Sequence, residues 1–151
     1  MKKIFVIAAL CAPLTAAIAP TPDPGQIIDL PAITIDAITH DDVVQAIIFV
    51  ESSGNDSAHR ISEDAVGCLQ IRRNMVRDVN RILRRNGSDK RYVYKDRWCR
   101  QSSIEMFNIY CEHYNLITLE EKARCWNGGP RGVHKLSTKR YWEKVKSRLN
   151  K

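Results

Sequence analysis

The sequence has no Cys-x-x-Cys pair, no internal repeat and no low-complexity tract. A repeat architecture is therefore excluded, and the cysteine spacing fits none of the usual zinc sites, so we expect neither a metal nor another cofactor. The apolar run near the N-terminus is short for a membrane span and is broken by Pro13. With 151 residues, the chain is long enough for one domain with a hydrophobic core and hardly for two.

The N-terminus has the features of a secretory signal peptide. Two lysines precede a wholly apolar stretch at residues 4–10, and small alanines follow where cleavage is expected. We expect residues 1–19 to be the signal peptide and the mature protein to be exported to the periplasm, the cell envelope or the extracellular space. Cleavage after Ala17, cleavage after Ala19 and an uncleaved N-terminal anchor all stay open.

The next segment, residues 20–39, contains four prolines. These forbid a continuous helix, so we expect a linker or an extended arm there. Residues 40–151 remain as the expected globular domain. The formal net charge is +7 for the whole chain and becomes +5 once the two leader lysines are removed. A modest positive charge suits an anionic polymer but does not say which one.

Four cysteines lie outside the leader: Cys68, Cys99, Cys111 and Cys125. An even number of cysteines in an exported chain predicts two disulfides, for which three pairings can be drawn. Free buried thiols are the main alternative. We set a zinc site aside, because Cys111 and His113 beside Cys99 do not have a usual ligand spacing.

One predicted helix carries an unusual acid. In residues 41–51 apolar side chains recur at the spacing of one helix face, and Glu51 occupies the next position on that face. We expect Asp41 or Asp42 to cap this helix and Gly54 to end it in a left-handed conformation. Burial and the negative end of the helix dipole both disfavour a carboxylate, so we expect the raised pKa that a general acid needs. A glutamate turned out to solvent at a frayed end is the alternative.

The rest of the domain is predicted as short helices separated by turns. Residues 55–71 predict a small β-hairpin or an irregular loop, with the β element at 67–71. Residues 88–101 are predicted to be a long surface connection. Further helices are predicted at 74–85, from Ser102 or Ser103 to 114, at 118–126 and at 138–149. The expected fold class is therefore mainly α, in an α+β arrangement of about five short helices around a small β-hairpin.

The arginines of residues 72–85 invite a nucleic-acid interpretation. However, Arg77, Arg81, Arg84 and Arg85 fall on the solvent side of the predicted helix. A solvated helix face explains them better, and the export signal points the same way. We therefore expect no nucleic-acid partner.

Three segments stand out together: Glu51-Ser52-Ser53-Gly54-Asn55, Gly67-Cys68-Leu69-Gln70-Ile71 and Ala123-Arg124-Cys125-Trp126-Asn127-Gly128-Gly129. Their order and spacing resemble the SLT-type lytic transglycosylase domain, which is lysozyme-like and related to goose-type lysozyme. That family has a Glu-Ser motif, then a Gly-x-x-Gln-hydrophobic motif, and later an Ala-x-x-Tyr-Asn-x-Gly motif. Its C-terminal helix often carries a tyrosine, which Tyr141 matches. The resemblance covers residues 40–146.

The resemblance implies an enzyme that cleaves the β-1,4 bond between N-acetylmuramic acid and N-acetylglucosamine in peptidoglycan. Glu51 matches the family's single catalytic acid, which protonates the glycosidic oxygen. Its conjugate base then helps the muramic 6-hydroxyl attack C1, giving a 1,6-anhydro product without water. Gln70 and Asn127 match residues of the sugar-binding site, and Ser52 matches the serine beside the acid. Trp126, whose ring could stack on a sugar face, and Tyr141 are the remaining candidates for substrate binding.

Two positions depart from the family pattern. Trp126 stands where the family usually has tyrosine, so either its indole N–H replaces the phenolic hydroxyl near the acid or the ring only packs. Cys68 and Cys125 lie inside the second and third motifs. If these motifs meet in space, a Cys68–Cys125 bridge would tie them beside the acid, which leaves Cys99–Cys111 as the other pair.

Other functions stay open at this point. A lysozyme-type hydrolase on the same fold would need a second carboxylate to position water, and Glu63, Asp64 and Asp56 are candidates. A catalytically inactive glycan-binding protein is a third interpretation. The expected partners are peptidoglycan glycan strands and a cell-envelope apparatus, and we expect a monomer.

Overall fold

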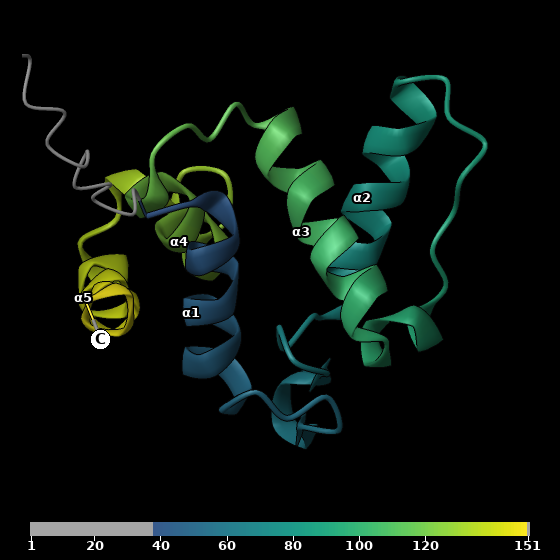
Figure 1. Cartoon of the computed structure of the whole chain (residues 1–151). Helices are drawn as coiled ribbons and strands as arrows, with labels where there is room; N and C mark the ends of the chain where they lie inside the picture. The colour runs from purple at the N-terminus through teal and green to yellow at the C-terminus, as the bar shows by residue number, and fades with distance from the viewer. Residues whose placement is uncertain (1–37, 151) are drawn as a thin grey trace, which may run out of the picture. The chain divides into compact units, whose positions relative to one another are not determined.

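Helices make up most of the computed structural model, which describes residues 38–150, and an antiparallel pair of short strands accompanies them (Figure 1). The expected fold class, mainly α with a small β-hairpin, is confirmed. The predicted signal peptide at 1–19 and residues 20–37 of the predicted linker lie outside the described residues. Among the helices of residues 38–150, none has the length and apolar character needed to cross a bilayer.

The helices are numbered along the chain. They are α1 (His40–Ser52), α2 (Arg73–Arg85), α3 (Arg100–His113), α4 (Leu119–Gly128) and α5 (Lys139–Leu149). The strands are β1 (His59–Arg60) and β2 (Ala65–Val66), and the short 3-10 helices are η1 (Ile61–Glu63), η2 (Tyr94–Trp98), η3 (Gly132–His134) and η4 (Leu136–Thr138). Helix α1 packs against α4 and α5, whereas α2 packs against α3 (Figure 1). The predicted helices are confirmed, with ends displaced by one or two residues.

The hydrophobic core joins all five helices. Val76 and Val79 of α2 are buried, and their i, i+3 spacing places them on one face of the helix. The core also contains Val43, Val44, Ile47 and Ile48 of α1, Met106 and Phe107 of α3, Ala123 of α4 and Val145 of α5. Because α1 has the largest apolar face and contacts both α4 and α5, its last turn is held rigidly where the site residues gather.

Both ends of α1 differ from the prediction. Thr39, rather than Asp41 or Asp42, is the N-cap: its Oγ1 accepts a hydrogen bond from the Asp42 N–H at 3.2 Å. The Asp42 carboxylate accepts one in return from the Thr39 N–H at 2.7 Å, which completes a capping box. At the other end Ser53 is the first left-handed residue, with φ 55°, one position before Gly54.

The hairpin lies within residues 55–71, as predicted, but its second strand precedes the predicted β element at 67–71. In β1 and β2, His59 pairs with Val66, whereas residues 67–70 form a turn, after which Ile71 pairs with Val66 in an isolated bridge. Gly67 explains this displacement, because its φ of 77° takes the chain out of an extended conformation. A Cβ at this position would lie 2.0 Å from the carbonyl oxygen of Arg97, so a side chain does not fit.

Part of the predicted surface connection at 88–101 is buried. Tyr92 and Arg97 are 5% and 4% exposed. The Arg97 guanidinium donates hydrogen bonds to the carbonyl oxygens of Asp64 at 2.7 Å and Ile71 at 3.1 Å. A buried charge is tolerated when its donors are satisfied in this way. Arg97 thereby fastens the hairpin and the turn after it to η2.

The four cysteines of residues 38–150 are free thiols. Cys99 is the N-cap of α3 and Cys111 lies near its C-terminal end, so twelve residues of helix, about 18 Å, separate them. That distance excludes the Cys99–Cys111 pair. The Cys68–Cys125 bridge stays a prediction. In this structure both thiols are buried and unbonded, and that of Cys125 lies 3.6 Å from the carbonyl oxygen of Pro130.

Candidate active site

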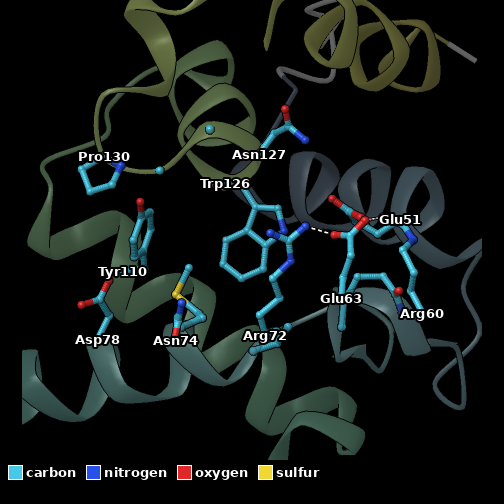
Figure 2. A pocket seen from close by; sticks show the side chains of 16 residues that line it. Glu51, Arg60, Glu63, Arg72, Asn74, Asp78, Tyr110, Trp126, Asn127 and Pro130 are labelled. Atoms are coloured by element: carbon cyan, nitrogen blue, oxygen red, sulfur yellow. Dashed lines mark ion pairs between the residues drawn. The ribbon is translucent and has the colours of Figure 1, made fainter. Parts of the chain in front are cut away.

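A cleft of about 380 Å³ lies where the predicted site residues converge (Figure 2). Its walls come from the end of α1, the hairpin with the turn after it, the start of α2 and the end of α4. Glu51, Gln70, Trp126 and Asn127 all line it. The three sequence motifs therefore meet in space, although Glu51 and Asn127 are far apart in the sequence.

Glu51 enters this cleft from the last turn of α1 and is partly buried. Burial raises the pKa of its carboxyl group above the ordinary value of 4.5. A hydrogen bond from Tyr141 and the positive charges of Arg60, Arg72 and Lys144 act in the opposite direction, but burial outweighs them. The alternative of a glutamate turned out to solvent is not what is observed. A carboxyl with this shift keeps its proton to a higher pH than an exposed glutamate does.

Tyr141 of α5 holds the acid in place. Its hydroxyl donates a hydrogen bond to Glu51 Oε1 at 2.8 Å. Burial and the adjacent acid raise the pKa of Tyr141 well above its usual value, so the phenol remains a donor. The described residues that line the cleft do not include Tyr141. The structure therefore places it as a partner of the acid rather than as the predicted sugar contact.

Trp126 packs instead of bonding to the acid. Its ring meets Phe107 edge-on with ring centroids 5.0 Å apart and meets Tyr110 at 6.2 Å. The phenolic hydroxyl that the family motif supplies from this position comes here from α5. Trp126 also lines the middle of the cleft, where an aromatic face can lie against a sugar ring (Figure 2).

Gln70 is built into the turn that follows the hairpin. Its backbone is left-handed, with φ 49°, and its Nε2 donates to the carbonyl oxygens of Ala58 at 3.1 Å and Gly67 at 3.0 Å. These bonds fix the side-chain amide and bind the loop after α1 to this turn. The amide oxygen is left as the group with which Gln70 can accept a hydrogen bond from a ligand.

The remaining two predicted residues have different positions. Asn127 is exposed on the α4 wall, with its amide free to reach a ligand (Figure 2). Ser52 lies outside the set of described residues that line the cleft, and its Oγ donates to the carbonyl oxygen of Ile48 at 3.1 Å. Ser52 is therefore part of the helix end and not of the binding surface.

Of the three acids considered as a second carboxylate, only Glu63 lines the cleft among the described residues. Asp64 is paired with Arg73 and with Arg97, and Asp56 lies 2.9 Å from the guanidinium of Arg100. Those two acids therefore serve to hold loops together.

Sequence reasoning considered Glu63 as an acid but missed the two arginines that pair with it beside Glu51. Glu63 forms an ion pair with Arg72, and Arg60 Nη1 lies 3.5 Å from Glu63 Oε1 (Figure 2). The sequence showed Arg72 only as one of many arginines next to α2. Nothing local distinguishes an arginine that enters a cleft from one that faces solvent.

Within residues 38–150, no group of three or more His, Cys, Asp or Glu side chains is placed to hold a metal ion. Comparison with known proteins adds no relative: no family model matches the chain, and no curated protein matches it. The resemblance to lytic transglycosylases therefore depends on the three motifs and on the cleft in which they meet.

Proposed function

We propose that this protein is an exported lytic transglycosylase that cleaves the β-1,4 bond between N-acetylmuramic acid and N-acetylglucosamine in peptidoglycan strands. The observation that supports this best is the environment of Glu51. A partly buried acid with a raised pKa shares one cleft with Gln70, Trp126 and Asn127. Such an acid keeps its proton to a higher pH than an exposed glutamate, as a general acid must, and the polar and aromatic groups around it suit a carbohydrate.

In this mechanism Glu51 first gives its proton to the glycosidic oxygen as the bond to C1 of the muramic acid breaks. The Glu51 carboxylate then takes the proton from the muramic 6-hydroxyl while that oxygen bonds to C1. The acid is regenerated, a 1,6-anhydro ring is formed and no water is consumed. One carboxyl group suffices because the substrate supplies the nucleophile. The Tyr141 hydroxyl stabilises the carboxylate between the two steps.

A lysozyme-type hydrolase is the second candidate, and the position of Glu63 in the cleft is the observation that favours it. Hydrolysis would use Glu63 to position or deprotonate water. In this structure Glu63 forms ion pairs with Arg60 and Arg72. The transglycosylase reaction needs no second carboxylate, so it remains the first candidate whether these pairs stay closed or open.

The test is digestion of purified peptidoglycan followed by mass spectrometry of the released fragments. The proposal predicts anhydro-muropeptides, each lighter by one water than the reducing-end product of a hydrolase. Glu51→Gln should release neither. Glu143→Gln, which neutralises an exposed acid of α5, is the matched control and should retain activity. Binding of glycan without cleavage by the wild-type protein would indicate the inactive, glycan-binding interpretation instead.

A further inference from the structure

Two guanidinium groups share a single carboxylate at the Glu51 end of the cleft. Arg72 and Arg60 approach Glu63 from different segments, the start of α2 and strand β1 (Figure 2). Both arginine side chains remain accessible, at 60% and 50% exposure, whereas Glu63 is 35% exposed. This group therefore carries one uncompensated positive charge within the cleft.

The start of α2 adds to this positive character. Arg72 is the N-cap, and none of the described residues provides a side-chain cap or an acid in the first turn. By contrast, α1 and α4 each begin with a capping box and acidic residues. Asn74 and Met75 of this first turn line the cleft, so the positive end of the helix dipole opens on the cleft.

The internal ion pair is easy to replace. A solvent-exposed pair between arginine and carboxylate contributes only about 0–1 kcal/mol, so opening it costs little. A guanidinium can form an ion pair with any accessible carboxylate, in a forked geometry where both oxygens reach it. A carboxylate on a ligand lying in the cleft can therefore take the place of Glu63 and leave Arg72 paired.

We propose that Arg60 and Arg72 form a carboxylate-binding subsite beside Glu51, which Glu63 fills from within while the cleft is empty. The inference rests on the proposed function, which places a glycan strand in this cleft. A peptidoglycan strand presents carboxylates either on its peptide stems or, where a stem has been removed, on the lactyl group of muramic acid. The subsite thus selects acidic glycans over neutral ones.

The test measures binding of three disaccharides to the leader-free wild-type protein by calorimetry. The first is GlcNAc-MurNAc with its peptide stem, the second is GlcNAc-MurNAc with a free lactyl carboxylate, and the third is N,N′-diacetylchitobiose, which has no carboxylate. None contains the bond that the proposed reaction cleaves. We expect Arg72→Gln to weaken binding of the acidic ligands by about tenfold and to leave chitobiose unchanged.

Glu63→Gln should have the opposite effect, because it removes the internal competitor, and should tighten the acidic ligands severalfold. Arg84→Gln, an exposed arginine in the last turn of α2, is the matched control and should change nothing. If Arg72→Gln weakens only the stem-bearing ligand, the subsite binds a carboxylate of the peptide stem. If it weakens both acidic ligands, the subsite also binds the lactyl carboxylate.

Several results would overturn the subsite. The first is that Arg72→Gln weakens binding of chitobiose as much as binding of the acidic ligands. The second is that Glu63→Gln weakens binding of the acidic ligands, and the third is that the wild type binds neither acidic ligand detectably. The outcome is separable from the proposed function. Carboxylate-dependent binding without anhydro products would refute the proposed function and support the subsite. Anhydro products with no effect of Arg72→Gln on binding would support the function and refute the subsite.

Discussion

The Tyr141 hydroxyl lies 2.8 Å from Glu51 Oε1, although ninety positions separate the two residues in the chain. This hydrogen bond stabilises the carboxylate form of Glu51 and so opposes the effect of burial on its pKa. The pKa of Glu51 therefore depends on two helices, α1 and α5, which pack against each other.

If the proposed cleavage of peptidoglycan uses Glu51 as its acid, Tyr141→Phe should move the pH dependence of the reaction upward. Without the phenolic donor the Glu51 carboxylate loses a stabilising hydrogen bond, so its pKa rises further and the alkaline limb of the pH–rate profile moves up by about one unit. The measurement is the rate at which soluble fragments are released from peptidoglycan, as a function of pH. Tyr94→Phe, at an exposed tyrosine, is the control. A downward shift, or none, would contradict the assigned role.

Glu51→Gln should stabilise the protein at neutral pH and leave it unchanged in acid. Because the folded-state pKa of Glu51 is raised, its favourable contribution is complete below about pH 4.5 and is lost as the pH rises through the folded pKa. Glutamine imposes no such loss, and its oxygen can still accept from Tyr141. Calorimetric melting of both proteins across the pH range should show a difference in Tm that grows with pH. A difference that is constant in pH would count against a buried acid.

A thiol reagent should label Cys99 first in protein that lacks residues 1–19, the predicted signal peptide. Cys99 is exposed, and hydrogen bonds from Ser102 lower the pKa of its thiol. Burial instead raises the pKa of Cys68 and takes that of Cys111 to about 12. Titration with Ellman's reagent should therefore find one fast thiol, absent in Cys99→Ser, and the other three after unfolding. Unfolded, unreduced protein without reactive thiols would mean that disulfides form after all.

Gly67→Ala should destabilise the fold more than Gly87→Ala. Both glycines are left-handed, with φ 77° and 71°, so both substitutions cost about 1 kcal/mol in backbone strain. At Gly67 the new Cβ would also lie 2.0 Å from the Arg97 carbonyl oxygen, whereas at Gly87 it would meet no atom of residues 38–150 within 4 Å. We expect a total loss near 2–4 kcal/mol for Gly67→Ala in urea unfolding. Equal losses at the two sites would show that the contact with Arg97 is unimportant.

The helices could be predicted from sequence because their signals are local. Apolar residues recur at helical spacing from Val76 to Leu83, and Thr118 and Glu121 form a capping box at the start of α4, next to the predicted helix start at 118. The same signals identified Glu51 as an acid on an apolar face. The β element was expected at 67–71 rather than at 65–66, because the decisive contact, between Gly67 and the backbone of Arg97, joins positions thirty residues apart.

The sequence by itself determined which segments are helical, where the acid lies in its helix and which three motifs carry the resemblance. Tertiary structure alone decided that Tyr141 rather than Trp126 bonds to that acid, that Ser52 stays outside the cleft and that Arg60, Glu63 and Arg72 gather beside it. The physical reason is the distance along the sequence over which each interaction acts. Helix propensity and capping act over a few neighbouring residues, whereas the environment that sets a pKa or an ion pair is assembled from elements distant in the chain.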